Sequence, residues 1–95
     1  MVEFTSDEQA FRALKRLLKS GIIASFEVYT SPTGVNLEIY LLSRNSSQQA
    51  FLFQRPTVKY TFQYRSLKEA ASSAFTEFHV DRECKVIDNV VKLYG

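Results

Sequence analysis

Apolar and polar residues follow two different periods along this chain, and the first stretch has the period of a helix. After Ser6, apolar residues recur at intervals of three and four, which is typical of an amphipathic helix. Ser6 and Gln9 form a capping-box pattern at its start, and Gly21 is suited to cap its end. We therefore expect a helix from about Asp7 to Ser20. Its apolar stripe consists of Ala10, Ala13, Leu14, Leu17 and Leu18, with Phe11 on the flank.

The period then changes to two in a pair of neighbouring stretches. From Ile22 to Tyr29, and again from Val35 to Leu42, successive residues alternate between two sets, which predicts strands with one buried face. Between them lies Ser-Pro-Thr-Gly at residues 31–34, in which proline fixes φ and glycine tolerates a positive φ. This spacing predicts an antiparallel hairpin.

A third alternating stretch, Thr57 to Arg65, leads directly into a second helical pattern. Ser66 and Glu69 form another capping box, and we expect a helix from Leu67 to about His79. Its apolar stripe consists of Leu67, Ala70, Ala71, Ala74, Phe75 and Phe78. A strand that leads into an amphipathic helix predicts a sheet with a helix packed on one face.

Two further segments leave alternatives open. Ala50–Phe53 has strand character, and Pro56 cannot donate to a strand ladder. This region therefore forms either two short strands or one long edge strand bent at the proline, and we favour a break near Arg55. Residues 81–94 fit either a third helix or a β-hairpin with a tight Asp-Asn turn. We favour the helix, because polar residues interrupt the alternation.

The predicted fold class is α+β, in one domain that spans residues 1–95. An antiparallel sheet of three or four strands carries two helices on one face, in the order α-β-β-β-(β)-α, and a C-terminal helix or hairpin completes the fold. With 95 residues, 45% of them apolar, the chain is long enough to bury one core.

The order helix, strand, strand, strand, helix, over about Asp7 to His79, resembles that of the double-stranded RNA-binding domain. In that family the second helix begins with a lysine-rich segment that contacts phosphates, and the first hairpin loop carries a His-containing probe. Here Lys68 is the only cation in Ser66–Ala71, and the hairpin loop has no His. The resemblance therefore implies an element order, and we infer no family membership from it.

Charge and cysteine content narrow the classes of protein further. The net charge is +2, and Cys84 is the only cysteine, so we expect no intrachain disulfide and a reducing cytoplasm as the compartment. No apolar run approaches the roughly 20 residues of a membrane span, and we expect no membrane partner. An electrostatic partner would have to recognise a local cluster of charges.

One cluster of side chains has the composition of a metal or nucleophile site: Glu77, His79, Asp81, Glu83 and Cys84. A zinc site requires about four convergent ligands, usually in spaced pairs, and this spacing does not provide them. A cysteine nucleophile also requires an orienting group and an oxyanion site. We therefore expect a non-enzymatic protein with no catalytic residue, metal, cofactor or small-molecule substrate.

Two surfaces are candidates for binding. The first helix carries a row of cations at helical spacing, with no acidic residue between them: Arg12, Lys15, Arg16 and Lys19. Such a row either contacts a phosphate backbone or is a solvated helix face. On the sheet face turned away from the helices we expect Ile23, Tyr29, Tyr40 and Leu42 beside Lys59, Thr61, Gln63 and Arg65.

These surfaces lead to two hypotheses. The first is a small non-enzymatic protein-interaction module or regulator that binds a partner protein, or a second copy of itself as a homodimer, through Tyr29, Tyr40 and Leu42. Tyrosine-bearing apolar faces are typical of protein interfaces. The alternative is a sequence-tolerant nucleic-acid binder, for RNA or DNA. Its cations are Arg12, Lys15, Arg16, Lys19, Lys59 and Arg65.

Overall fold

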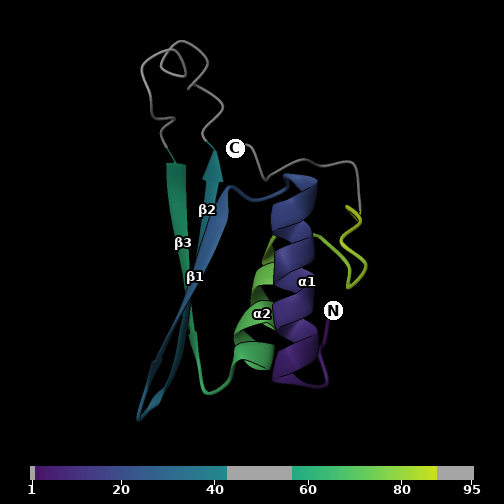
Figure 1. Ribbon diagram of the computed structural model, residues 1–95. Helices are drawn as coiled ribbons and strands as arrows, with labels where there is room; N and C mark the ends of the chain where they lie inside the picture. Colours follow the sequence, from purple (N-terminus) through teal and green to yellow (C-terminus); the bar gives the residue numbers. More distant parts are fainter. Residues whose placement is uncertain (1, 43–56, 88–95) are drawn as a thin grey trace.

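Two helices lie on one face of a single antiparallel sheet (Figure 1). The computed structural model describes residues 2–42 and 57–87. Its elements are α1 (Asp7–Ser20), β1 (Ser25–Ser31), β2 (Gly34–Leu42), β3 (Thr57–Tyr64) and α2 (Leu67–Glu77), with β2 as the central strand. The predicted α+β class, with two helices and three antiparallel strands, is confirmed. The fourth strand expected at Ala50–Phe53 lies outside the described residues.

Helix α1 begins and ends where its caps predict. The Ser6 hydroxyl accepts a hydrogen bond from the Gln9 N–H at 3.1 Å. At the other end Gly21 has a left-handed φ of +83°, and its N–H donates to the Leu18 carbonyl at 3.2 Å. The predicted bounds of this helix are therefore confirmed. Within the described ranges, neither α1 nor α2 has the length and apolar character of a membrane-crossing helix.

Strand β1 begins later than the pattern predicted. The Ile22 and Ile23 N–H groups both donate to the Leu17 carbonyl, at 3.1 and 3.4 Å, so the chain is still wrapped around the end of α1. Ile23 is only 2% exposed and belongs to the core. The prediction that Ile23 lies on the sheet face away from the helices is therefore wrong. The backbone at Ile23 is still hydrogen-bonded to the end of α1, so β1 begins after it and the side chain lies in the core.

The buried face of β2 forms the centre of the core. The residues that point towards the helices are Leu37, Ile39 and Leu41, each at most 2% exposed. The register places Phe62 of β3 opposite Leu37, and Tyr60 opposite Ile39. Both aromatic rings contact Phe78 edge to face, at centroid distances of 5.9 and 5.3 Å. The helices complete the core with Ala10, Ala13, Leu14, Leu17, Ala70, Ala71, Ala74 and Phe75.

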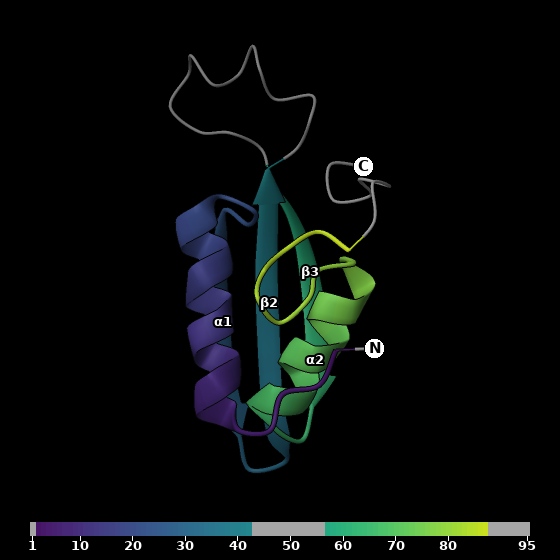
Figure 2. The ribbon, with the colours of Figure 1, turned by 90° about the vertical axis from the view of Figure 1, so that its right-hand side faces the viewer.

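The chain after α2 folds back across the helices. Val80 and Val86 form an antiparallel bridge that closes a loop, which we call the C-terminal loop (residues 80–86). This loop lies over the space between the two helices, on the side away from the sheet (Figure 2). It contacts α1 directly, because the Cys84 Sγ donates to the Ala13 carbonyl at 3.5 Å.

The helix predicted for this segment is wrong for the residues that the structure describes. The Asp81 carboxylate accepts hydrogen bonds from the N–H groups of Glu83 and Lys85, both at 2.9 Å, and these local bonds compete with helical ones. Cys84 has a left-handed φ of +68°, which is incompatible with a helix at that position. Residues 88–95, which carry the turn of the hairpin alternative, lie outside the described residues.

The two turn glycines differ in why they are required. At Gly21 an added Cβ would meet no atom within 4 Å, so Gly21→Ala costs only the strain of a left-handed residue, about 1 kcal/mol of unfolding free energy. At Gly34 the added Cβ would lie 2.5 Å from the Tyr64 carbonyl oxygen, and β3 would have to move. We expect Gly34→Ala to cost about 2 kcal/mol or more. Urea denaturation measures both values, and an equal or smaller loss for Gly34→Ala would contradict this account.

Candidate functional site

The sheet face opposite the helices is covered by no described element (Figure 1). Since side chains alternate along a strand, it carries the residues that flank the buried ones of β2. The register aligns Tyr29 with Asn36, and Tyr40 with Lys59. We call this surface the outer face; its members are Glu27, Tyr29, Asn36, Glu38, Tyr40, Leu42, Lys59, Thr61 and Gln63. Tyr29, Tyr40 and Leu42 thus share one surface.

Two tyrosine–glutamate pairs stiffen the outer face. The Tyr29 hydroxyl donates to Glu27 Oε1, and the Tyr40 hydroxyl donates to Glu38 Oε1 at 2.9 Å. Glu27 and Glu38 are direct cross-strand neighbours, an arrangement in which like charges are destabilising. Among the described residues Lys59 is the one cation within ion-pair distance of either carboxylate, 3.8 Å from Glu38. The face therefore combines two oriented tyrosine rings with an excess of negative charge.

The glutamates keep both tyrosine hydroxyls protonated over a wide pH range. The hydrogen bond to Glu27, followed by desolvation and by the negative charges of Glu27 and Glu38, raises the pKa of Tyr29 to about 12. The hydrogen bond to Glu38 raises the pKa of Tyr40 in the same way. Each hydroxyl is protonated at neutral pH and donates to its own carboxylate.

A hollow of about 740 Å³ opens beside the outer face at the turn between β1 and β2. Its wall includes Tyr29, Asn36, Gln63 and Arg65. The Asn36 Oδ1 atom is buried and has no hydrogen-bond partner among the described residues. A buried acceptor without a donor costs free energy. The Asn36 Oδ1 atom therefore carries a desolvation cost in the folded protein that no described donor offsets.

The four cations predicted on α1 are all exposed, on the side of the helix away from the core. We call this set, Arg12, Lys15, Arg16 and Lys19, the basic face. The Arg12 guanidinium lies 3.5 Å from the Glu8 carboxylate, so the first cation of the basic face has an acidic partner one turn earlier in the helix. Lys15 Nζ lies 5.2 Å from the centroid of the Phe11 ring. Among the described residues no carboxylate lies within ion-pair distance of Lys15, Arg16 or Lys19.

The other two predicted cations lie elsewhere. Lys59 is on the outer face beside Glu38, and Arg65 lines the hollow next to Asn36. Lys59 lies on the face of the sheet opposite to the helices, and Arg65 follows β3 beside the turn between β1 and β2 (Figure 1). The structure therefore divides the six predicted cations into two groups that do not form one surface.

Arg82 lies beside the basic face, although it is far from α1 in sequence. The C-terminal loop brings it to a hollow of about 270 Å³ whose wall also contains Arg12 and Arg16. We call this the arginine hollow; its other lining residues are Phe4, Gln9, Ala13 and Glu83. The sequence pattern did not indicate Arg82, because its position depends on a loop that returns over α1.

Cys84 is a packing residue of the C-terminal loop. Burial raises the pKa of its thiol, against a smaller opposing effect of the Arg16 guanidinium. A thiol that stays protonated, with its S–H donated to the Ala13 carbonyl, is a poor nucleophile. In residues 2–42 and 57–87, no three His, Cys, Asp or Glu side chains are grouped as a metal site requires.

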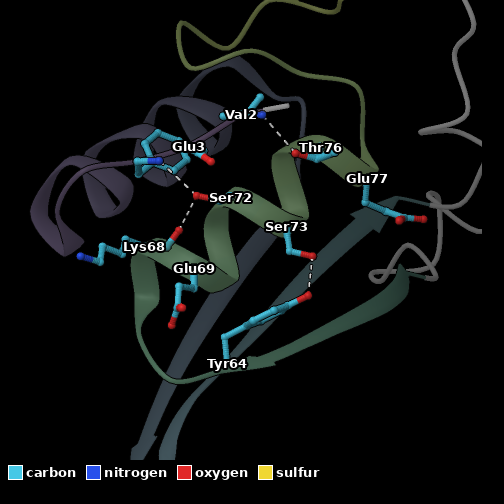
Figure 3. A pocket seen from close by; sticks show the side chains of 10 residues that line it. Val2, Glu3, Tyr64, Lys68, Glu69, Ser72, Ser73, Thr76 and Glu77 are labelled. Carbon is cyan, nitrogen blue, oxygen red and sulfur yellow. Dashed lines mark hydrogen bonds between the residues drawn. The ribbon is translucent and has the colours of Figure 1, made fainter.

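A further hollow, of about 500 Å³, lies over α2 (Figure 3). Its hydroxyl groups already bond to other parts of the chain. The Tyr64 hydroxyl donates to Ser73 Oγ at 2.8 Å, and Ser72 Oγ accepts from the Phe4 N–H at 3.1 Å. These bonds attach β3 and the N-terminal segment to α2, so we assign this hollow a structural role.

No protein-family model, curated protein or solved structure matches this chain. The function therefore has to be inferred from the outer face and the basic face, which differ in charge. The described part of the outer face has two carboxylates, those of Glu27 and Glu38, and one cation, Lys59. The basic face has only cations, and Arg82 lies beside it.

Replacement of Glu27 tests the origin of the Tyr29 pKa. Glu27→Gln removes the negative charge next to the hydroxyl, so we expect the pKa of Tyr29 to fall from about 12 towards the ordinary value of about 10. NMR titration of the tyrosine ring carbons measures this change. Tyr40 serves as the internal control and should keep most of its shift, because its carboxylate is Glu38. An unchanged pKa at Tyr29 would show that another group causes the shift.

Proposed function

We propose that this protein is a small non-enzymatic interaction module, or regulator, that binds a partner protein through the outer face. The observation that carries the proposal is the pair of tyrosines whose hydroxyls are bonded to Glu27 and Glu38. Tyrosine supplies a large contact area at a low cost in conformational entropy, because its side chain has only two rotatable bonds. Cys84, the only cysteine, is a free thiol, and we place the module in the reducing cytoplasm.

The charge of the outer face favours a partner with basic side chains. Glu27 and Glu38 lie opposite one another, and a Lys or Arg of the partner between them relieves their repulsion. A second copy bound face to face brings the same carboxylates together instead. We therefore favour a different protein over a homodimer.

The size of the outer face indicates the class of complex. Strands of 7 to 9 residues span about 25 Å, and three strands span about 14 Å, so the face covers roughly 350 Å² in projection. A standard interface buries about 800 Å² on each partner. Accessible surface exceeds projected area because it includes the relief of the side chains. A partner that covers this face alone still forms an interface below the standard size, as in some transient signalling complexes.

Negative charge introduced on the outer face tests the proposal. We expect Tyr40→Asp and Leu42→Asp to weaken partner binding by about 2 kcal/mol, roughly thirtyfold in Kd, because each removes an apolar contact and adds a carboxylate. Cross-linking in cells followed by mass spectrometry identifies the partner, and calorimetry with the purified partner measures Kd. The matched control is Leu18→Asp, the same change at a leucine of α1 that is 41% exposed.

The outcomes of this experiment separate three cases. Loss of binding in both outer-face variants, with Leu18→Asp unaffected and all variants folded by circular dichroism, supports the proposal. Retained binding in both variants, or an equal loss in Leu18→Asp, refutes it. Sedimentation over a range of concentrations detects self-association, and a dimer that Leu42→Asp dissociates would identify a second copy as the partner.

The basic face supports a second candidate function, the binding of RNA or DNA without sequence preference. The observation in its favour is the position of Arg82 beside Arg12 and Arg16 in the arginine hollow. Lys15 and Lys19 extend the row, and neither has a carboxylate within ion-pair distance in the described part of the chain. Such cations are available to phosphates, and each contact releases counterions from the nucleic acid.

Charge reversal on α1 tests this second function. Fluorescence anisotropy with labelled double-stranded RNA, double-stranded DNA and single-stranded RNA should show binding that weakens steeply between about 50 and about 200 mM salt. Arg16→Glu and Lys19→Glu should lower the affinity for all three by a similar factor and reduce the salt dependence. Lys59→Glu, on the outer face, is the control and should change neither. Binding that does not respond to salt, or that responds equally to Lys59→Glu, would argue against the basic face.

The two candidate functions are physically compatible. The helix layer, about 10 Å thick, separates the basic face from the outer face, and this exceeds the Debye length of about 8 Å at physiological salt. Charges on one surface are therefore largely screened from a ligand on the other. Variants of each surface consequently report on that surface alone.

A further inference from the structure

The C-terminal loop is built to hold Arg82 in place. Its ends pair as a β-bridge, and the Cys84 N–H donates to the Asp81 carbonyl at 2.9 Å. The Asp81 carboxylate accepts hydrogen bonds from two further backbone N–H groups of the loop. The Cys84 Sγ contact with the Ala13 carbonyl then fixes the loop against α1. Arg82 is therefore carried on a hydrogen-bonded turn whose position does not depend on the Arg82 side chain.

The arginine hollow contains more positive than negative charge. Three arginines line it, and among the described residues Glu83 is the one acidic residue in its wall. Glu8 pairs with Arg12 at 3.5 Å, but both side chains are largely exposed, so this ion pair contributes little. Like charges held together repel one another, and an anion between them relieves the repulsion. The planar fork of a guanidinium matches phosphate in particular, through paired N–H donors.

We infer that the arginine hollow binds one phosphate group of a nucleic-acid backbone. This inference rests on the second candidate function and adds the point at which the strand is held. From Arg12 to Lys19 the cations of α1 extend over about 10 Å, which is longer than a single phosphate group requires. A chain of successive phosphates contacts the whole row, whereas an isolated anion contacts the hollow alone.

Arg82→Gln and Lys85→Gln form a matched pair of variants in the same loop. Both remove one positive charge, but Lys85 does not line the hollow. We expect Arg82→Gln to weaken nucleic-acid binding about tenfold and to reduce the salt dependence by about one phosphate contact. Lys85→Gln should change the affinity by less than about twofold, since Lys85 does not line the hollow. Glu83→Gln, which removes the carboxylate from the wall, should strengthen binding.

NMR signals of the arginine Nε–H groups give a readout that needs no nucleic acid. Inorganic phosphate should shift the signals of Arg82 and Arg16, whereas sodium chloride at equal ionic strength should not.

If Lys19→Glu weakens nucleic-acid binding but Arg82→Gln does not, the inference is overturned and the second function stands. If the parent protein binds no nucleic acid, both the second candidate function and the inference that the arginine hollow holds a backbone phosphate are wrong. A phosphate-induced shift then identifies a site for free phosphate, and the absence of a shift excludes an anion site.

Discussion

The burial of Leu37, Ile39 and Leu41 under the two helices is the interaction on which the rest of the structure depends. These side chains belong to the central strand, so their burial sets the register of β1 and β3 and the face on which α2 packs. Because side chains alternate along a strand, the same packing turns Glu38 and Tyr40 to the opposite face. The acidic, tyrosine-bearing outer face is therefore a consequence of how the core is filled.

The helices are joined at the end of the molecule where both begin (Figure 2). There the Asp7 carboxylate accepts a hydrogen bond from the Lys68 N–H at 2.9 Å, so one acidic side chain lies at the positive ends of both helix dipoles. The acidic residues of α1 are its first ones, Asp7 and Glu8, and cations follow along the rest of the helix. The C-terminal loop lies beside the middle of α1, which is why Arg82 lines one hollow with Arg12 and Arg16.

Most of the described secondary structure, and part of the candidate site, could be predicted from the sequence because these features are local. The bounds of α1 follow from Ser6 and Gly21, which cap residues only a few positions away. The common face of Tyr29 and Tyr40 follows from alternation and from a hairpin whose register the turn sets. The start of α2 follows from Ser66 in the same way, since its hydroxyl accepts from the Glu69 N–H at 3.3 Å.

Tertiary structure alone decided the features that join distant parts of the chain. The inward turn of Ile23 depends on the end of α1, and the separation of Lys59 from the basic face depends on which side of the sheet the helices cover. Arg82 reaches the arginine hollow because local bonds of Asp81 replace the expected helix with a loop. The sequence by itself thus determined the two helices, the three strands and the residues that alternate onto the outer face or follow the basic face. Only packing between elements decided which cations share a surface, because residue spacing encodes neighbours within an element and not between elements.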